Sequence, residues 1–563
     1  MKRLNIVMMA FVAFVSSGVC DAQTVVSQSC EQSIVVPKAS GRYLWLPIEE
    51  KAPEGKVQVI LSGLLQMECN VRMARENVDY YMPLDLKPYF GHGVMKVCVQ
   101  NVPTSSVCFS KLAQNDDADF AAINEKYRPV YHHTPKRGWM NDPNGMFYKD
   151  GVWNLYYQFN PYGSMWGNMH WGHSTSTDLF HWEDKGVALA PDVWGTIFSG
   201  SCVVDKNSNS VVSLYTTSRP TPFGGDVQAQ CIAYSNDGGK TFTKFEGNPV
   251  LTDEAKDFRD PKAFWNPELQ AWNLVLAVGQ EMRIFSSKDL KNWKFESAFG
   301  KGYGNHDGVW ECPDLMKLQV RGTDTQKWML ICNINPGGPF GGSATQYFVG
   351  DFDGHTFTCD HKDTRWMDYG KDHYATVTFD NAPDGRRVAL AWMSNWQYAN
   401  EVPTKQFRSA NSVPRDLDLF EYNGQYYCGV TPSKELLALR GKKTANPSEA
   451  CEIVVDAKGP MTLTLSNTKG EQVTMRYDKA AKTFTMNREK SGDTAFSEAF
   501  PVETTAPVYG NIRQFRIFID RCSIEVFDAE GRLAMTNLVF PTEPYSKLTV
   551  KGGKASVYQL TGF

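Results

Sequence analysis

Three acidic residues, far apart along the chain, share a local pattern in which a proline follows one or two residues later. Asp142 lies in the run WMNDPNG (Trp139 to Gly145), Asp260 in the tripeptide RDP, and Glu311 in the tetrapeptide ECPD. A proline biases the residue before it toward extended backbone, so these acids are expected at the lips of strands. Each acid alone is better explained as part of an ordinary turn. Together they predict glycoside hydrolysis, for which two convergent carboxyl groups suffice.

The neighbours of two of these acids favour the ionised form. Asp142 is flanked by Asn141 and Asn144, whose amides can donate hydrogen bonds and keep a carboxylate charged, as a nucleophile requires. Asp260 follows Arg259, and a neighbouring cation also favours the charged acid. An ionised Asp260 could bind sugar hydroxyls and strengthen those bonds as positive charge develops in the transition state.

Glu311 has a different setting, because it lies between Trp310 and Cys312. Surroundings that exclude water favour the neutral acid, which can give a proton to a leaving oxygen. We therefore expect Glu311 to be the general acid/base and Asp142 the nucleophile. A retaining reaction further predicts that their carboxyl groups lie roughly 5 to 5.5 Å apart.

Composition indicates a globular protein with a neutral substrate. The 563 residues are 42% hydrophobic and 13% aromatic, which is ample for sizeable cores. The formal net charge of −4, without a long run of like charge, gives no reason to expect nucleic acid as a partner. Of 15 tryptophans, 14 lie between Trp139 and Trp396. Flat aromatic faces stack on apolar sugar faces, so the middle of the chain is expected to be the working part, although many of these rings will be core residues.

The first 22 residues have the layout of a secretory signal peptide. Lys2 and Arg3 precede an apolar run from Leu4 to about Val15, and cleavage is expected after Ala22. The run is too short to span a bilayer. We expect export to the periplasm or the exterior, with no transmembrane segment. A lipid anchor at Cys20 is the alternative, since this cysteine loosely matches a lipoprotein cleavage site.

The 13 cysteines fit either disulfides or buried free thiols. An exported chain permits disulfides, and Cys98 with Cys108 forms a plausible local bridge. No spacing of cysteines resembles a zinc site, and we expect no metal.

An internal repeat predicts the architecture of the middle of the chain. Ser-x-Asp or Asp-x-Asp turns recur at intervals of 52 to 64 residues, each with an aromatic residue four or five positions after its last aspartate; the aspartates are Asp178, Asp237, Asp289 and Asp353. That period fits one four-stranded propeller blade per repeat. The three acids precede the turns of their blades by similar distances, which places them on the first strands, nearest the axis. They are therefore expected to converge on the central cavity.

The remaining segments also read as β structure, so the fold class is expected to be all-β. Residues 24–118 alternate in short runs and predict a small N-terminal β domain, whose role we expect to be packing rather than carbohydrate binding. Residues 127–432 form the predicted propeller and residues 441–563 a predicted antiparallel sandwich, with a short helical connector between them. In the sandwich, the run from Asp520 to Phe527 is interpreted as a strand with an exposed charged edge.

Five motifs in one order make the chain resemble family 32 of the glycoside hydrolases, the β-fructofuranosidases that include invertases, inulinases and levanases. The motifs are WMNDPNG, FSGS at Phe198 to Ser201, RDP, ECP and the run DRCSIEVF from Asp520. The resemblance covers roughly residues 127–563. It implies a five-bladed propeller followed by a β-sandwich, and retaining hydrolysis through a fructosyl-enzyme intermediate. It also implies that Asp142 is the nucleophile, Asp260 the transition-state stabiliser and Glu311 the acid/base.

The resemblance further implies a pocket for the terminal fructose. The residues expected to bind substrate there are Asn141, Gln158, Trp166, Phe198, Ser199, Arg259, Asp372 and Trp396. His373 stands where the family usually has an aromatic residue, which affects the shape of that pocket wall. The segment from Trp392 to Ala399 resembles exo-acting inulinases and levanases more than invertases.

These features predict a retaining exo-β-fructosidase that acts on levan or inulin and on sucrose, without metal or organic cofactor. The alternatives are an endo-acting levanase, a transfructosylase and a non-catalytic fructan-binding protein. The sequence does not decide between β-2,1 and β-2,6 linkages, and it does not set the oligomeric state.

Overall fold

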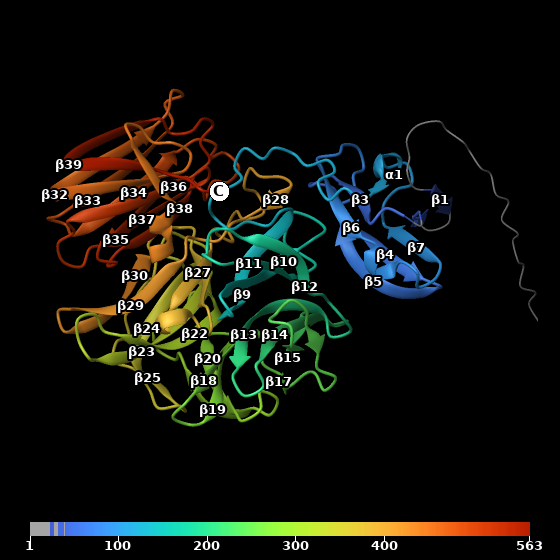
Figure 1. The fold of residues 1–563 in the computed structure, drawn as a ribbon, viewed down its shortest axis with the longest axis horizontal. Helices are drawn as coiled ribbons and strands as arrows, with labels where there is room; N and C mark the ends of the chain where they lie inside the picture. The colour runs from blue at the N-terminus through green and yellow to red at the C-terminus, as the bar shows by residue number, and fades with distance from the viewer. Residues whose placement is uncertain (1–22, 28–31, 39) are drawn as a thin grey trace, which may run out of the picture. The chain divides into compact units, whose positions relative to one another are not determined.

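A computed structural model describes residues 23–27, 32–38 and 40–563, and these divide into two compact units, with the boundary between residues 122 and 123 (Figure 1). The predicted signal peptide and Cys20 lie outside the described residues. Strands dominate both units, as the all-β prediction requires. Within the described chain, no helix is long and apolar enough to cross a membrane.

The N-terminal unit contains two antiparallel sheets. One has the order β1 (Gln23–Ser27), β2 (Gln32–Val36), β7 (Met95–Gln100), β4 (Gly55–Leu61), β5 (Leu64–Val71), and the other β6 (Tyr80–Asp85), β3 (Tyr43–Ile48), β8 (Ala113–Asn115). A 3-10 turn η1 (Lys87–Tyr89) and a short helix α1 (Cys108–Lys111) complete the unit. The predicted bridge between Cys98 and Cys108 is wrong, because Cys108 is a buried free thiol. Burial in apolar surroundings raises the pKa of the Cys108 thiol to about 12, so it is inert.

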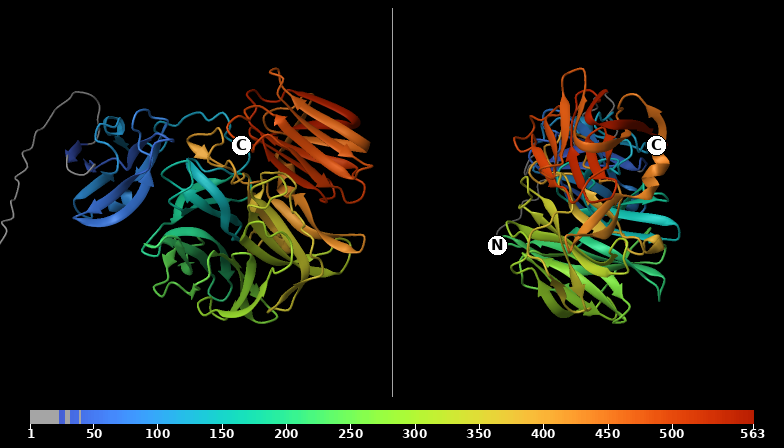
Figure 2. Two further views of the ribbon diagram at one scale, coloured as in Figure 1. Left: turned by 180° about the vertical axis from the view of Figure 1, so that it is seen from behind. Right: turned by 90° about the vertical axis from the view of Figure 1, so that its left-hand side faces the viewer.

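The second unit begins with five antiparallel sheets that form the predicted propeller (Figures 1 and 2). Blade 1 contains β9 (Gly138–Lys149), β10 (Val152–Asn160), β11 (His170–Ser176) and β12 (Glu183–Leu189). Blade 2 contains β13 (Thr196–Asp205), β14 (Ser210–Pro220), β15 (Asp226–Ser235), β16 (Thr243–Lys244) and β17 (Leu251–Thr252). Blade 3 contains β18 (Phe258–Asn266), β19 (Ala271–Val278), β20 (Glu281–Ser287) and β21 (Lys294–Phe299).

Blade 4 contains β22 (Val309–Gln319), β23 (Gln326–Asn335), β24 (Ala344–Phe352) and β25 (Phe357–Cys359). Blade 5 contains β26 (Tyr374–Thr378), β27 (Val388–Trp392), β29 (Arg415–Tyr422) and β30 (Gln425–Pro432), with the 3-10 turn η2 (Pro383–Gly385) between its first two strands. The first strands β9, β13, β18, β22 and β26 contact one another in a closed ring. A short strand β28 (Phe407–Arg408) pairs in parallel with β9 and ties the end of the propeller to its start.

The repeated aspartates confirm the blade prediction. Each follows the third strand of its blade and folds the turn that leads to the fourth. In blade 2, Asp237 accepts hydrogen bonds from the Ser235 hydroxyl (2.7 Å) and from the backbone N–H groups of Lys240 and Thr241 (both 3.0 Å). Against the opposing effect of its burial, these donors lower the pKa of Asp237 to about 2. A carboxylate that accepts several backbone hydrogen bonds fixes such a turn.

The first strand of every blade carries a bulge near its start. The pairing with the second strand is interrupted at residues 141–142, 198–199, 260–261, 312–313 and 375–376. Three of these bulges contain a residue with left-handed backbone, namely Asp260 (φ 66°), Cys312 (φ 43°) and Ala375 (φ 55°). A bulge re-aims side chains and tolerates proline, which cannot donate to the ladder. The recurring acid and proline are therefore the local sequence around the bulges of blades 1, 3 and 4.

After the propeller, a 3-10 turn η3 (Lys434–Leu439) occupies the predicted connector and leads to the sandwich. The sandwich strands are β31 (Arg440–Thr444), β32 (Cys451–Ser466), β33 (Gln472–Asp478), β34 (Thr483–Lys490), β35 (Glu503–Pro507), β36 (Gln514–Asp520), β37 (Ser523–Asp528), β38 (Ala534–Leu538) and β39 (Lys547–Leu560). The long strands β32 and β39 pair on both sides of an irregularity between Ala457 and Thr462. Before it β32 also pairs with β36, and after it with β33, so both strands pass from one sheet to the other.

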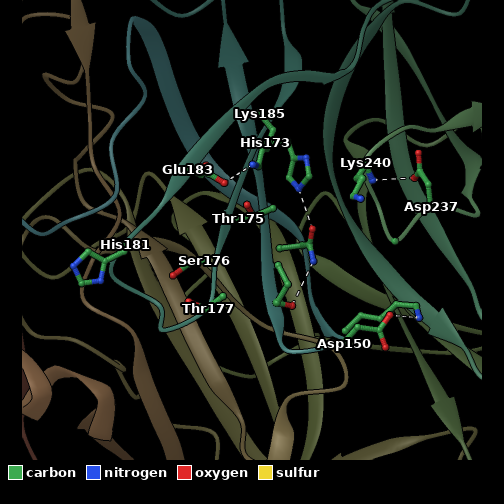
Figure 3. Close-up of a pocket in the computed structure, with 14 residues that line it drawn as sticks. Asp150, His173, Thr175, Ser176, Thr177, His181, Glu183, Lys185, Asp237 and Lys240 are labelled. Atoms are coloured by element: carbon green, nitrogen blue, oxygen red, sulfur yellow. Dashed lines mark hydrogen bonds and ion pairs between the residues drawn. The ribbon is translucent and has the colours of Figure 1, made fainter.

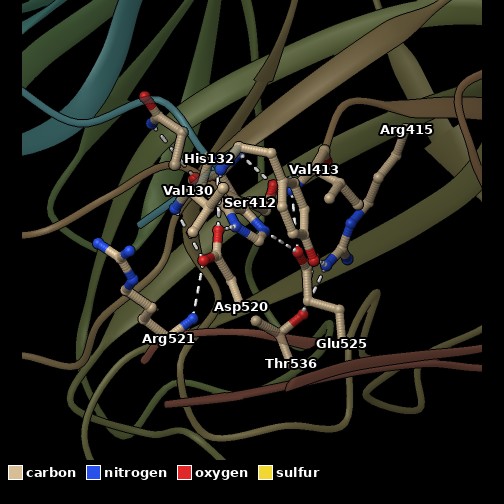
Figure 4. Close-up of polar contacts among 12 residues, drawn as sticks. Val130, His132, Ser412, Val413, Arg415, Asp520, Arg521, Glu525 and Thr536 are labelled. Carbon is tan, nitrogen blue, oxygen red and sulfur yellow. Dashed lines mark hydrogen bonds and ion pairs between the residues drawn. The ribbon is translucent and has the colours of Figure 1, made fainter. Parts of the chain in front are cut away.

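Asp520 and Glu525 are buried, so the predicted exposed edge is wrong. Both ring nitrogens of His132, which precedes the first blade, lie 2.8 Å from a carboxylate, Nδ1 from Asp520 and Nε2 from Glu525 (Figure 4). Arg415 in blade 5 donates to Glu525 (2.6 Å) and to Asp368 (2.8 Å). We call Asp368, Asp520 and Glu525 the junction acids, because they join the propeller to the sandwich.

Candidate active site

Asp142 lies in the bulge of β9, where the side chains of Asn141 and Ser199 donate to its carboxylate. The Trp139 indole donates to the Asn141 amide oxygen (2.7 Å), and that amide donates to Asp142 Oδ1 (2.9 Å). The Ser199 hydroxyl from blade 2 donates to Oδ2 (2.6 Å). Burial raises the pKa of Asp142 and the charge of Glu311 adds to that effect, while the Ser199 and Asn141 hydrogen bonds oppose it. The donors orient both oxygens and favour the charged form.

Asp260 lies in the bulge of β18 and is almost fully buried. Its Oδ2 accepts a hydrogen bond from the backbone N–H of Cys312 (2.9 Å). Burial raises its pKa to about 7, because the charge of Arg259 is outweighed by burial together with the charges of Glu311 and Asp142. The expectation that Arg259 keeps Asp260 fully charged is therefore wrong near neutral pH.

Glu311, at the edge of the β22 bulge, is held by two side chains. Arg259 Nη2 donates to Oε1 (2.9 Å), and the Tyr374 hydroxyl donates to Oε2. The same guanidinium donates to Asp257 (2.8 Å), and its Nε lies 3.9 Å from Asp260. One cation thus serves several carboxylates at this point.

These contacts bring the three predicted acids together, and we call Asp142, Asp260 and Glu311 the axial acids. The Cys312 thiol lies 3.5 Å from an oxygen of Asp142 and 3.6 Å from one of Asp260. Beside them the axis is nearly filled, since a cavity of about 10 Å³ remains, lined in part by Pro143, Pro261 and Pro313. That volume suits about one water molecule, so no sugar fits into this part of the axis.

The predicted aromatic residues lie on segments at the same end of blades 1, 2 and 5. Trp166 follows β10, is 45% exposed, and meets Phe198 edge to face at 6.2 Å between ring centroids. Trp396 follows β27 and stacks on Trp139 at 5.8 Å. The exposed face of Trp166 is available to an apolar sugar surface.

Gln158 lies on β10 and is buried behind the acids. Its amide donates to the backbone carbonyl of Ile197 (3.0 Å). With its amide oriented to satisfy both polar atoms, Asn144 accepts from Gln158 (3.1 Å) and donates to Ser199 (3.3 Å). Gln158 therefore supports Ser199, which in turn holds Asp142.

The structure does not bring Asp372 to the axial acids. Its side chain is fully buried in an ion pair with Arg488 of the sandwich. The Tyr398 hydroxyl donates to its Oδ1 (2.5 Å) and the Leu538 N–H to its Oδ2 (2.7 Å). Because its side chain is completely buried against the sandwich, Asp372 is not open to a sugar, and its expected place in the pocket is corrected.

Sequence reasoning missed three contributors to the site, namely Tyr374, Asp257 and the backbone N–H of Cys312. The segment around Tyr374 is expected to form a pocket wall, but nothing local in the sequence indicates that its phenol reaches Glu311. No group of three or more His, Cys, Asp or Glu side chains suited to a metal ion occurs in the part of the chain that the structure describes.

A larger hollow of about 820 Å³ lies elsewhere, on the flank of blades 1 and 2 (Figure 3). It is lined by residues of β10, β11 and β12 and by the turn at Asp237, and it contains none of the predicted site residues. Two of the lysines in its wall are paired, Lys149 with Asp150 and Lys185 with Glu183. It offers none of the convergent carboxyl groups that the axial site provides.

Comparison with known proteins agrees with this arrangement. Residues 132–429 match the family model "Glycosyl hydrolases family 32 N-terminal domain" and residues 428–561 match "Glycosyl hydrolases family 32 C terminal". Residues 29–131 match a domain of unknown function, DUF4980.

Named relatives and solved structures cover the same part of the chain. A levanase of Bacillus subtilis (strain 168) is 44% identical over 76% of this chain and 68% of its own length. An extracellular exo-inulinase of Aspergillus niger is 36% identical over 76% of this chain and 93% of its own length. The crystal structure of the exo-inulinase from Aspergillus awamori superposes with a TM-score of 0.71 at 33% identity, covering 77% of this chain and 98% of that one.

Proposed function

This chain belongs to glycosyl hydrolase family 32 and is a glycoside hydrolase, and from that premise we propose that it removes terminal β-fructofuranosyl units from fructans with retention of configuration. The observation that carries the proposal is the pair of differently held carboxyl groups at the axis. Asp142 is fixed by the donors Asn141 and Ser199, and Glu311 by Arg259 and Tyr374.

In the first step, an ionised oxygen of Asp142 attacks the anomeric carbon of the terminal fructose. The bond from that carbon to the glycosidic oxygen breaks, and Glu311 gives its proton to the departing oxygen. The products are a covalent fructosyl ester on Asp142 and the shortened chain. Asn141 and Ser199 hold the attacking carboxylate in one orientation, which lowers the entropic cost of reaching the transition state.

In the second step, Glu311 accepts a proton from a water molecule, and the resulting oxygen attacks the same carbon. The ester bond to Asp142 breaks, fructose leaves, and both carboxyl groups return to their starting forms. One water molecule is consumed in each cycle.

Asp260 is proposed to bind fructose hydroxyls and to stabilise the positive charge that develops on the sugar. This requires its ionised form, and a pKa of about 7 means that ionisation occurs near neutrality. Its hydrogen bond from Cys312 N–H keeps one oxygen in place, which leaves the other free for substrate.

Exo action on levan or inulin is supported by the similar proteins, which are named a levanase and exo-inulinases. Endo action is the alternative, and early products separate the two, because exo action releases only fructose and endo action releases oligosaccharides.

Export is proposed on the signal-like residues 1–22 and on relatives named extracellular. The mass of the mature N-terminus checks this, since cleavage after Ala22 and acylation of Cys20 leave different products.

The test of the acid assignment is Glu311→Gln, assayed on a fructan and on a β-fructosyl fluoride, whose leaving group needs no proton. Because an amide cannot donate that proton, we expect a loss of about 10³-fold in kcat/KM on fructan and a much smaller loss in kcat/KM on the fluoride. The ratio kcat/KM reports the first step alone, whereas kcat also contains the second step, in which Glu311 is the base. Glu281→Gln, an acid on the neighbouring β20 that touches no axial acid, is the matched control and should leave both rates unchanged. Equal losses on the two substrates would remove Glu311 from the role of acid.

A further inference from the structure

We propose that the C-terminal sandwich positions the general acid, with β38 fixing the backbone that leads to Tyr374 and Arg488 locking that backbone through Asp372. The inference rests on the proposed function, because it takes Glu311 as the acid. Arg488 is then a positioning residue of the reaction, although it belongs to a different domain from the axial acids.

The first step is the contact between β38 and the segment that precedes β26. Tyr369 N–H donates to the Ala534 carbonyl (2.9 Å) and Asp372 N–H to the Thr536 carbonyl (3.2 Å). The approach is close at Gly370, where an added Cβ would lie 1.8 Å from the Thr536 oxygen. The segment is therefore laid against a sandwich strand and is not an independent propeller loop.

The second step is the set of bonds made by Arg488. Its guanidinium contacts Asp372 and donates to the carbonyls of Phe500 (2.8 Å) and Leu538 (2.9 Å) and to the Tyr398 hydroxyl (2.8 Å). It also stacks over the Phe500 ring, 3.9 Å from the centroid. The side chains of both members of the ion pair are completely buried.

A buried ion pair is weak evidence for stability, because desolvating two charges costs about as much as their attraction returns. The pair of Asp372 and Arg488 instead fixes the positions of the groups around it, because a planar guanidinium with four oriented acceptors tolerates little displacement of any of them. Asp372 is bonded at both oxygens, by Tyr398 at one and by the Leu538 N–H at the other. The backbone at residue 372 is consequently fixed from the sandwich side.

The third step connects this anchor to the acid. Tyr374 is two residues further on, is 1% exposed, and donates from its hydroxyl to Oε2 of Glu311. Beyond it the chain enters the bulge at Ala375, whose left-handed backbone limits how the strand can adjust. The phenol is thus held between a sandwich anchor on one side and a bulge on the other, while Arg259 holds the second oxygen of Glu311.

A purely structural role for Arg488 would lower stability without regard to the leaving group, whereas a positioning role affects proton donation. The experiment therefore compares Arg488→Lys, Tyr374→Phe and the double variant on fructan and on β-fructosyl fluoride. His132→Gln is the matched control, since it breaks an equally buried ion pair between propeller and sandwich but touches no residue of 368–374.

We expect Arg488→Lys to lower kcat/KM on fructan at least about tenfold, while kcat/KM on the fluoride, whose first step needs no proton, is nearly retained. Tyr374→Phe should show the same pattern, and the double variant should be no worse than Tyr374→Phe alone, because the two act in series. His132→Gln should lower the melting temperature and leave both kcat/KM values unchanged.

Equal losses on the two substrates for Arg488→Lys, or additive losses in the double variant, would overturn the inference. Should Arg488→Lys fail to fold, Asp372→Asn, which keeps the size of the side chain and its acceptor oxygen, replaces it with the same expectations. Glu311→Gln is run beside these variants. If its own losses are equal on both substrates, the proposed function fails; if they differ while those of Arg488→Lys do not, only this inference fails.

Discussion

The axial acids and the junction acids are both groups of three buried carboxyl groups, but they differ in how much positive charge and how many hydrogen-bond donors surround them. At the axis, the guanidinium of Arg259 is the cation bonded to the group, and it is shared with Asp257. At the junction, Arg415 and His132 both lie against the carboxylates. Backbone N–H groups add to the junction, where those of residues 130–132 donate to Asp520.

The protonation of the two groups follows from this difference. Burial raises the pKa of Asp260 to about 7 because too little positive charge opposes it. Glu525 is also buried, yet its pKa is lowered, because the charge of Arg415 and the hydrogen bond of His132 overcome burial. An undercompensated cluster keeps carboxyl groups near their ionisation point and suits proton transfer, whereas a compensated cluster suits fixed structure.

Replacing one aspartate by asparagine in each group tests this difference most directly. Asp260→Asn, among the axial acids, has the largest expected effect. Loss of the charge that stabilises the transition state should reduce kcat on fructan by about 10² to 10³-fold. The variant should nevertheless be more stable at pH 8. The raised folded pKa means that the contribution of Asp260 to stability is present below its unfolded value and is lost as pH rises through about 7.

The gain for Asp260→Asn is expected to be on the order of 2 to 4 kcal/mol at pH 8, measured by chemical denaturation. At pH 4, where the aspartate is neutral in the folded protein, the difference between variant and wild type should nearly vanish. A destabilised variant at pH 8 would show that Arg259 does compensate Asp260 after all.

Asp520→Asn should give the opposite result. It removes the carboxylate that accepts from His132 and leaves a buried cation with a single partner, which costs about 3 to 5 kcal/mol. Activity per folded molecule should stay within twofold, because Asp520 contacts no axial acid. Measuring kcat and the folded fraction on the same samples distinguishes a loss of stability from a catalytic defect. A loss of kcat in fully folded Asp520→Asn would contradict the prediction.

The smallest effect concerns pH alone. Burial would lower the pKa of His132, but the hydrogen bonds that its ring donates to Asp520 and Glu525 outweigh burial and raise the pKa to about 9. Its contribution is therefore complete below pH 6.5 and is lost as pH rises through about 9, by up to about 3 kcal/mol. Between pH 6.5 and pH 9.5, the free energy of unfolding should fall more for the wild type than for His132→Gln. Parallel curves would show that His132 is neutral in the folded protein.

Much of the fold could be predicted because it is encoded locally. The Ser-x-Asp turns carry their own donors and acceptors within five residues, so Asp237 and its repeats identify blades before any tertiary contact is known. The acid and proline of the bulges are likewise neighbours in sequence. Once the blades are counted, the ring of first strands brings the axial acids together.

The misassigned residues are those whose partners lie far along the chain. Asp520 reads as a solvent-exposed charge until His132, 388 residues away, is placed against it. Asp372 is predicted to be a pocket residue, but in the structure its carboxylate is paired with Arg488 of the sandwich. Tyr374 carries no local sign of its bond to Glu311, 63 residues earlier.

By itself, the sequence determined the strand pattern, the blade repeat, the family and the identity of the three axial acids, because turns, bulges and motifs depend on residues adjacent in the chain. Tertiary structure alone decided which acids are short of positive charge, where Asp372 points and what holds Glu311. The reason is physical: burial and charge compensation are properties of everything within a few ångströms, and a folded chain supplies those neighbours from distant segments.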